Sequence, residues 1–282
     1  MIFSKKFNYL IYALLVPFAV LPLVAGLGFA VLYSVGLVGV LNNGFTGEHW
    51  MKIFSEGNVL QSFLYSTAIA IVSLLISVSL SLLVSLKHHQ SFRKGLLSYL
   101  IYMPLAFPGI VAAFFFFQLL TKSGVVSRLL YQLRLISSID QFPDLINDTF
   151  GIGMITAHVF LSFPFFVLLF VNIIKTERIV EYQQLASTFA ATKWQSLFRV
   201  SIPMLLQKAL PNIILYFIFI FGAFEVPLLL GRSNPEMVSV LAVRKLQRFN
   251  LLDIPQGYAI AVLYTIFVFI LLVFLFKVKS RQ

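Results

Sequence analysis

Glu225 has the clearest potential for chemistry, because it is the only acidic residue well inside a long apolar segment of the sequence. A charge at the centre of a bilayer costs roughly 2.5–3.5 kcal/mol, so an intramembrane acid needs a partner or a function. Glu225 lies six residues before Gly231, toward the end of its segment. We expect its carboxylate either to pair within a helix bundle or reach the outer interface, or to line a translocation pathway that suits a cation.

The other reactive side chains point away from enzymatic chemistry. His158 lies in a second apolar segment with no further His or Cys at ligand spacing, so it is expected to be a packing residue, and no metal site is predicted. The absence of cysteine excludes disulfides and thiol chemistry. The sequence has no G-x-x-x-x-G-K-[ST], which excludes a P-loop for ATP, and its apolar segments contain no nucleophile–base pair or carboxylate dyad.

The composition is that of a polytopic membrane protein. The 282 residues are 60% hydrophobic and 11% charged, and they include 31 Phe. The net charge of +11 is therefore expected from basic residues that flank membrane spans rather than from a nucleic-acid surface.

Six apolar runs are long enough to cross a bilayer, which takes about 20 helical residues. The sequence thus predicts an all-α protein with one transmembrane domain over residues 1–282. Pro104 and Pro108-Gly109 should break or kink the third span. The predicted spans are 9–41, 60–86, 96–120, 150–174, 202–230 and 257–276.

The connections between these spans differ in basic residues. One side carries twelve Lys or Arg, the other carries eight, and Lys208 falls inside the fifth span. Since cytoplasmic loops are enriched in Lys and Arg, both termini are predicted to be cytoplasmic. The loop over residues 175–201 then faces the cytoplasm as well.

Apolar residues of this loop recur at helical spacing. Tyr182, Leu185 and Phe189 form one cluster, and a second follows after a short gap at Trp194, Leu197 and Phe198. This pattern predicts two short amphipathic helices joined by a tight turn. They would either lie on the lipid headgroups or present a docking surface to a soluble protein.

Four groups of residues in this loop keep a fixed spacing: Gln184-Leu185-Ala186, Ala190-Ala191, Trp194 and Val200-Ser201-Ile202-Pro203. Aligned on Pro203, they resemble the loop motif E-A-A, three residues, G-A, an aromatic stretch and I-x-L-P of the membrane permease subunits of binding-protein-dependent ABC importers. Gln184 replaces the acid of that motif, which leaves at best a neutral hydrogen bond. Ala190 replaces the glycine, so a positive φ at this position would carry a steric cost.

The resemblance extends over most of the chain. Residues 45–50 resemble the approach to the second span, 103–111 a Pro-containing third span, and 122–126 the loop after it. Residues 222–231 are similar to the fifth-span ending of permeases for polyamines and inorganic ions.

The resemblance implies the type I permease fold and a role for the loop as a coupling helix. In this family the loop docks on a cytoplasmic ATPase dimer, which binds ATP and Mg, so this chain itself needs no cofactor. A second permease or a second copy would complete the pathway in the bacterial inner membrane, and an extracytoplasmic solute-binding protein would deliver substrate; nucleic acid has no role. Phe189 and Trp194 are the expected docking side chains. The coupling residues it implies are Gln184, Leu185, Ala186, Phe189, Ala190, Ala191, Trp194 and Pro203.

Three further points stay open. The alternative function is a transporter or channel that works alone on an ion gradient, with the loop merely interfacial. Residues 127–148 and 239–249 would either be solvated charged faces or contact the solute-binding protein. In the second span, small residues at spacings of three and four indicate close helix packing or a polar pathway wall: Ser62, Ser66, Ala70, Ser73, Ser77, Ser81 and Ser85.

Overall fold

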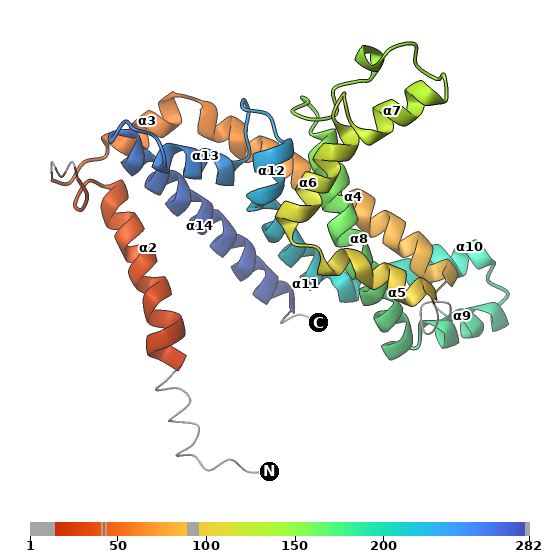
Figure 1. The fold of residues 1–282 in the computed structure, drawn as a ribbon. Coiled ribbons are helices and arrows are strands. Elements are labelled where there is room, and N and C mark those ends of the chain that lie inside the picture. The colour runs from red at the N-terminus through yellow and green to blue at the C-terminus, as the bar shows by residue number, and fades with distance from the viewer. Residues whose placement is uncertain (1–14, 41, 43, 89–95, 280–282) are drawn as a thin grey trace, which may run out of the picture. The chain divides into compact units, whose positions relative to one another are not determined.

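The computed structural model describes residues 15–40, 42, 44–88 and 96–279, and every regular element in these ranges is helical (Figure 1). Residues 9–14 and 41 of the predicted first span, and Lys5, Lys6, Arg93, Lys94 and Arg281 of the charge count, lie outside them. The elements are η1 (Val16–Val20), α2 (Leu21–Ser34), α3 (Glu48–Ser55), α4 (Asn58–His88), α5 (Leu96–Tyr102), η3 (Met103–Ala106), α6 (Gly109–Leu120), α7 (Val125–Gln132), η4 (Ile139–Gln141), α8 (Ile152–Thr176), α9 (Ile179–Thr188), α10 (Lys193–Ser196), η5 (Leu197–Ser201), α11 (Ile202–Phe221), α12 (Glu225–Leu230), α13 (Val238–Leu246) and α14 (Asp253–Lys279).

The described residues form two compact units. The first contains the chain up to Gln61 together with Val238–Ile270, and the second contains Ser62–Met237 and the residues from Leu271. Six helical segments in the described ranges are long and apolar enough to cross a membrane, which confirms the predicted number of spans. These segments are Val16–Ser34, Asn58–His88, Gly109–Gln132, Ile152–Thr176, Lys193–Phe221 and Asp253–Lys277.

The third predicted span is broken at its prolines, as the sequence indicated. α5 ends at Tyr102, a 3₁₀ turn follows, and Phe107 and Pro108 are extended before α6 begins. A proline lacks the amide hydrogen of the helical ladder and disfavours helical geometry in the residue before it. The range 96–120 therefore holds two short helices, and the N-terminus of α6 lies at the break.

The fifth span differs from the prediction at both ends. α10, η5 and α11 run continuously from Lys193 to Phe221, so the helix begins nine residues before the predicted Ile202. It stops at Gly222, and α12 forms a separate short helix from Glu225. Continuing it would place the ring of Pro227 against the carbonyl of Ala223, four residues earlier, which a regular helix does not accommodate. Hydropathy misses this break because residues 226–230 remain apolar.

The small-residue stripe of α4 packs inside the second unit. All seven of its residues are at most 1% exposed. The Ser77 and Ser162 hydroxyls lie 2.6 Å apart, while Ser81 and Ser85 donate to backbone carbonyls of α8. The stripe thus lets α4 and α8 approach closely and share hydrogen bonds, which favours the packing interpretation.

A hydrophobic core fixes α12 against α6 and α8. Val226 and Leu230 of α12 pack with Ala113 and Phe116 of α6 and with Met154 of α8, and all five are buried. This packing holds Glu225, the first residue of α12, beside the start of α6.

The first unit is held by aromatic and ionic contacts. Tyr33 of α2 stacks on Tyr258 of α14 with ring centroids 4.5 Å apart. Lys245 of α13 lies 3.0 Å from the carboxylate of Glu56, which follows α3.

Candidate functional site

The loop between α8 and α11 folds as a helix–turn–helix, as the sequence predicted (Figure 1). Arg178, with φ +52°, turns the chain from α8 into α9. At the start of α10 the Thr192 hydroxyl accepts from the Gln195 amide, and the Gln195 side chain accepts from the Thr192 amide. This capping box satisfies two amides that the start of a helix leaves unbonded.

Ala190 forms the turn between α9 and α10 in the left-handed conformation, with φ +56°. The Ala190 amide donates to the Ser187 carbonyl and the Ala191 amide donates to the Ala186 carbonyl. These two bonds are the Schellman pattern, which usually has glycine at the left-handed position. The turn therefore keeps the geometry that glycine favours although the residue is alanine.

Large apolar side chains cover the outside of this helix–turn–helix. Phe189 is 79% exposed and Trp194 is 69% exposed, and Trp194 stacks on Phe198 with ring centroids 5.5 Å apart. Tyr182 and Leu185 are each about half exposed. We call these five residues the apolar surface of the loop.

The other predicted coupling residues surround this surface. Gln184 is exposed on α9, Ala186 and Ala191 are half-buried, and Pro203 is exposed near the start of α11. Of the residues expected from the motif, those from Gln184 to Trp194 lie in one helix–turn–helix, whereas Pro203 lies beyond η5.

Two polar contacts that the sequence did not reveal hold the first half of the loop against the helical segment that follows the turn. The Gln183 side chain donates to the Ser201 hydroxyl at 2.7 Å. Lys208 of α11 lies 3.1 Å from the carboxylate of Glu177. Lys208 is a basic residue inside the fifth predicted span, and its partner Glu177 lies 31 residues away in the sequence, where no spacing rule links them.

Glu225 lies where the two broken spans meet. Its side chain is exposed, and a Cβ atom added at Gly109, the first residue of α6, would overlap its carboxylate. The N-terminus of a helix carries a partial positive charge that stabilises a carboxylate. The absence of a side chain at Gly109 allows this approach.

Comparison with known proteins identifies the family. Residues 80–279, which contain the loop and Glu225, match the family model of the binding-protein-dependent transport system inner membrane component. The chain belongs to this family. It is a permease subunit of an ABC importer.

Two known proteins are similar to this chain, one in sequence and one in fold. The permease is 27% identical over 190 residues to the molybdenum transport system permease protein ModB of Azotobacter vinelandii, covering 67% of this chain and 79% of that protein. Its fold matches a chain in the crystal structure of a bacterial ABC transporter involved in the import of the acidic polysaccharide alginate. That match has a TM-score of 0.72 and 18% identity and covers 98% of the permease and 96% of the other chain.

Basic residues of segment 239–249 of the permease make polar contacts within the first unit. Lys245 is 6% exposed and donates to Glu56 and to the Gln256 side chain. Arg248 lies 3.3 Å from Asp253. These contacts favour a structural role for Lys245 over contact with another protein.

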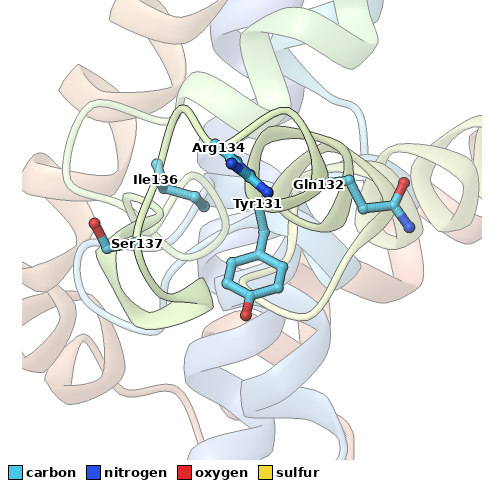
Figure 2. Close-up of a pocket in the computed structure, with 5 residues that line it drawn as sticks. All are labelled: Tyr131, Gln132, Arg134, Ile136 and Ser137. Atoms are coloured by element: carbon cyan, nitrogen blue, oxygen red, sulfur yellow. The ribbon is translucent and has the colours of Figure 1, made fainter.

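The segment after α6 presents a more open surface. Lys122 pairs with the exposed Asp144 at 3.0 Å. A hollow of about 360 Å³ lies at the end of α7, where Arg134 has a left-handed φ of +56°. Figure 2 shows its five lining side chains: Tyr131, Gln132, Arg134, Ile136 and Ser137.

His158 is buried inside the second unit. It is 2% exposed on α8, and its carbonyl accepts from the Ser162 hydroxyl, which also contacts Ser77. This position favours the packing role over metal binding.

Proposed function

We propose that the helix–turn–helix of the permease docks on a cytoplasmic ATPase and transmits its movement to the membrane spans. The observation that carries this proposal is the exposure of Phe189 and Trp194 on a turn fixed by a Schellman motif and a capping box. Large aromatic side chains that enter a groove provide most of the binding energy in such contacts.

The permease needs a partner for ATP hydrolysis, because its sequence has no P-loop. The proposed partner is a dimer of ATP-binding subunits, which carry ATP and Mg. Closure of that dimer would push the helix–turn–helix and switch the pathway between inward and outward access. A second permease subunit, related or identical, would supply the other half of the pathway.

The proposed orientation places both termini and the helix–turn–helix in the cytoplasm. Twelve Lys and Arg in the connections on that side against eight on the other support it. The segments containing α3, α7 and α13 then face outward, toward an extracytoplasmic solute-binding protein. The ligand that co-purifies with that binding protein would identify the substrate.

The docking proposal is tested by replacing Phe189 and Trp194 with alanine. Each replacement should weaken co-purification of the ATPase by at least about tenfold, since hot-spot truncations cost about 2 kcal/mol or more. Phe150→Ala is a matched control, because Phe150 is 78% exposed but lies just before α8, outside the loop. Full binding by both loop variants, or an equal loss in the control, would contradict the proposal.

The alternative of a stand-alone transporter has its own test. The purified permease, reconstituted into liposomes without the ATPase, should show no solute uptake under an ion gradient. Uptake without ATP would overturn the coupled mechanism, even if the ATPase also binds.

We also propose that Glu225 lines the translocation pathway. Its exposure beside the breaks of the third and fifth spans supports this, because discontinuous helices build transporter binding sites. The sequence has no cysteine, so Glu225→Cys would be a unique thiol. This cysteine should react with a membrane-impermeant thiol reagent. Leu215→Cys is the control: Leu215 lies on α11 and is also exposed in the chain, but it should face lipid and stay unlabelled. Absence of labelling at position 225 with and without ATP would exclude this role.

A further inference from the structure

Two contacts fasten the segment from Glu177 to Gln183 to the long helix that follows the turn, one at η5 and one at α11. At the first, Gln183 of α9 donates to Ser201 at 2.7 Å. At the second, Glu177, the residue that caps the end of α8, pairs with Lys208 of α11 at 3.1 Å. The two contacts connect the segment before the turn with the helix after it.

The first contact is made at an irregular part of the helix. η5 is a π-helical segment between α10 and α11, and Ser201 is its last residue. The Ser201 hydroxyl is buried and also donates to the carbonyl of Ser196, five residues earlier, at 3.4 Å. A π segment is a place where a helix can change direction. Gln183 therefore braces the helix where a push on α10 would otherwise bend it.

The second contact braces the corner between α8 and α9. The Glu177 side chain is 34% exposed and that of Lys208 is 49% exposed. An ion pair with this exposure contributes little to overall stability. It joins the corner between α8 and α9 to the second turn of α11.

We propose that Glu177, Gln183, Ser201 and Lys208 form a clamp that makes the helix–turn–helix and α11 move as one body. This inference rests on the proposed function, since the movement originates at a docked ATPase. With the clamp closed, displacement of Trp194 carries α11 along as far as its end at Gly222, beside Glu225. With the clamp open, α10 bends at η5 and α11 stays in place. In this proposal the four residues act as positioning residues.

The test measures movement separately from docking. Spin labels are attached to cysteines introduced at Phe150 and Phe219. Because the sequence has no cysteine of its own, only these two positions are labelled. Both side chains are exposed, and both belong to the second unit. The measured quantity is the change in the distance between the two labels when the complex of the permease with its ATPase is trapped with ATP and orthovanadate.

Clamp variants should keep the ATPase but lose the response. Lys208→Gln should bind the ATPase as the unmodified chain does and show a smaller distance change, and Lys208→Gln with Gln183→Leu should abolish that change. Arg178→Gln is the matched control, because among the described residues Arg178 pairs within the loop, with Glu181 at 3.8 Å, and this variant should respond fully. The reversed pair, Glu177→Lys with Lys208→Glu, should restore the response.

The outcomes separate this clamp from the proposed function. If no ATPase co-purifies with the unmodified chain, the proposed function fails. If the ATPase binds and the double variant still gives the full distance change, the clamp is overturned. If the single variants fail to fold, the variant with the reversed pair, Glu177→Lys with Lys208→Glu, decides. A restored distance change in this variant supports the clamp. The clamp is overturned if this variant folds and binds the ATPase but shows no distance change.

Discussion

Replacing Ala190 by glycine should stabilise the turn between α9 and α10. Ala190 is left-handed, with φ +56°, and its Cβ atom makes that conformation costly by about 1–2 kcal/mol. Glycine removes this cost, but its greater conformational freedom stabilises the unfolded chain by about 0.4–1 kcal/mol. The expected net gain is about 1 kcal/mol in the free energy of opening the turn, which corresponds to a factor of about five.

Amide hydrogen exchange of the purified permease measures this opening. The Ala190 and Ala191 amides donate to Ser187 and Ala186, so they exchange only when the turn opens. In Ala190→Gly both should exchange about fivefold more slowly.

The neighbouring Ala191 provides the control, because its φ is not positive. Ala191→Gly should speed exchange, since glycine gains nothing there and destabilises by about 0.5–1 kcal/mol. Unchanged or faster exchange in Ala190→Gly would refute the left-handed turn. Equal slowing in both variants would show that the effect is not specific to position 190.

Three further perturbations test the packing and charges of the two units. Ser77→Leu should lower the free energy of unfolding in detergent by about 1–3 kcal/mol, because the larger side chain overpacks the α4–α8 contact. Ser77→Ala should lower the same free energy by only about 0.6 kcal/mol. Equal effects of the two variants would contradict this packing. Lys245→Met should lower the same free energy by about 1–3 kcal/mol, because buried Gln256 loses its donor, and a neutral result would show that the network is not needed. Burial and nearby Lys52 lower the pKa of His49 below its ordinary 6.5. The folded state then binds fewer protons than the unfolded state, so stability should fall as pH drops below about 6.5. His49→Gln should reduce this fall, and an unchanged pH profile of thermal unfolding would contradict the assignment.

The sequence predicts the features of this protein that depend on local rules. Six spans follow from apolar length, and the break of the third span follows from Pro104 and Pro108, which cannot complete the helical ladder. The helix–turn–helix follows from apolar spacing. The position of its turn agrees with the register of the loop motif that the sequence resembles, in which Ala190 stands at the glycine position.

The sequence does not reveal contacts between distant residues. Glu177 and Lys208 are each ordinary charges at or near a helix end, and only the fold brings them together. Lys245 counts as surface charge in any composition argument, yet Glu56 and Gln256 enclose it. The end of α11 at Gly222 is hidden because hydropathy averages across it and Pro227 acts on a carbonyl four residues earlier.

The serine stripe of α4 also bears on how α4 is aligned along α8. A slip of α4 by one turn along α8 would bring Ser81 to the place of Ser77 and Ser85 to the place of Ser81. Ser81 and Ser85 bond to backbone carbonyls, which every turn of a helix offers, so these bonds distinguish one alignment from the next only weakly. Ser77 bonds to a side chain, and that partner, Ser162, occurs at one level of α8. Among these three hydrogen bonds, the Ser77–Ser162 pair therefore distinguishes one alignment of α4 and α8 from the next most strongly.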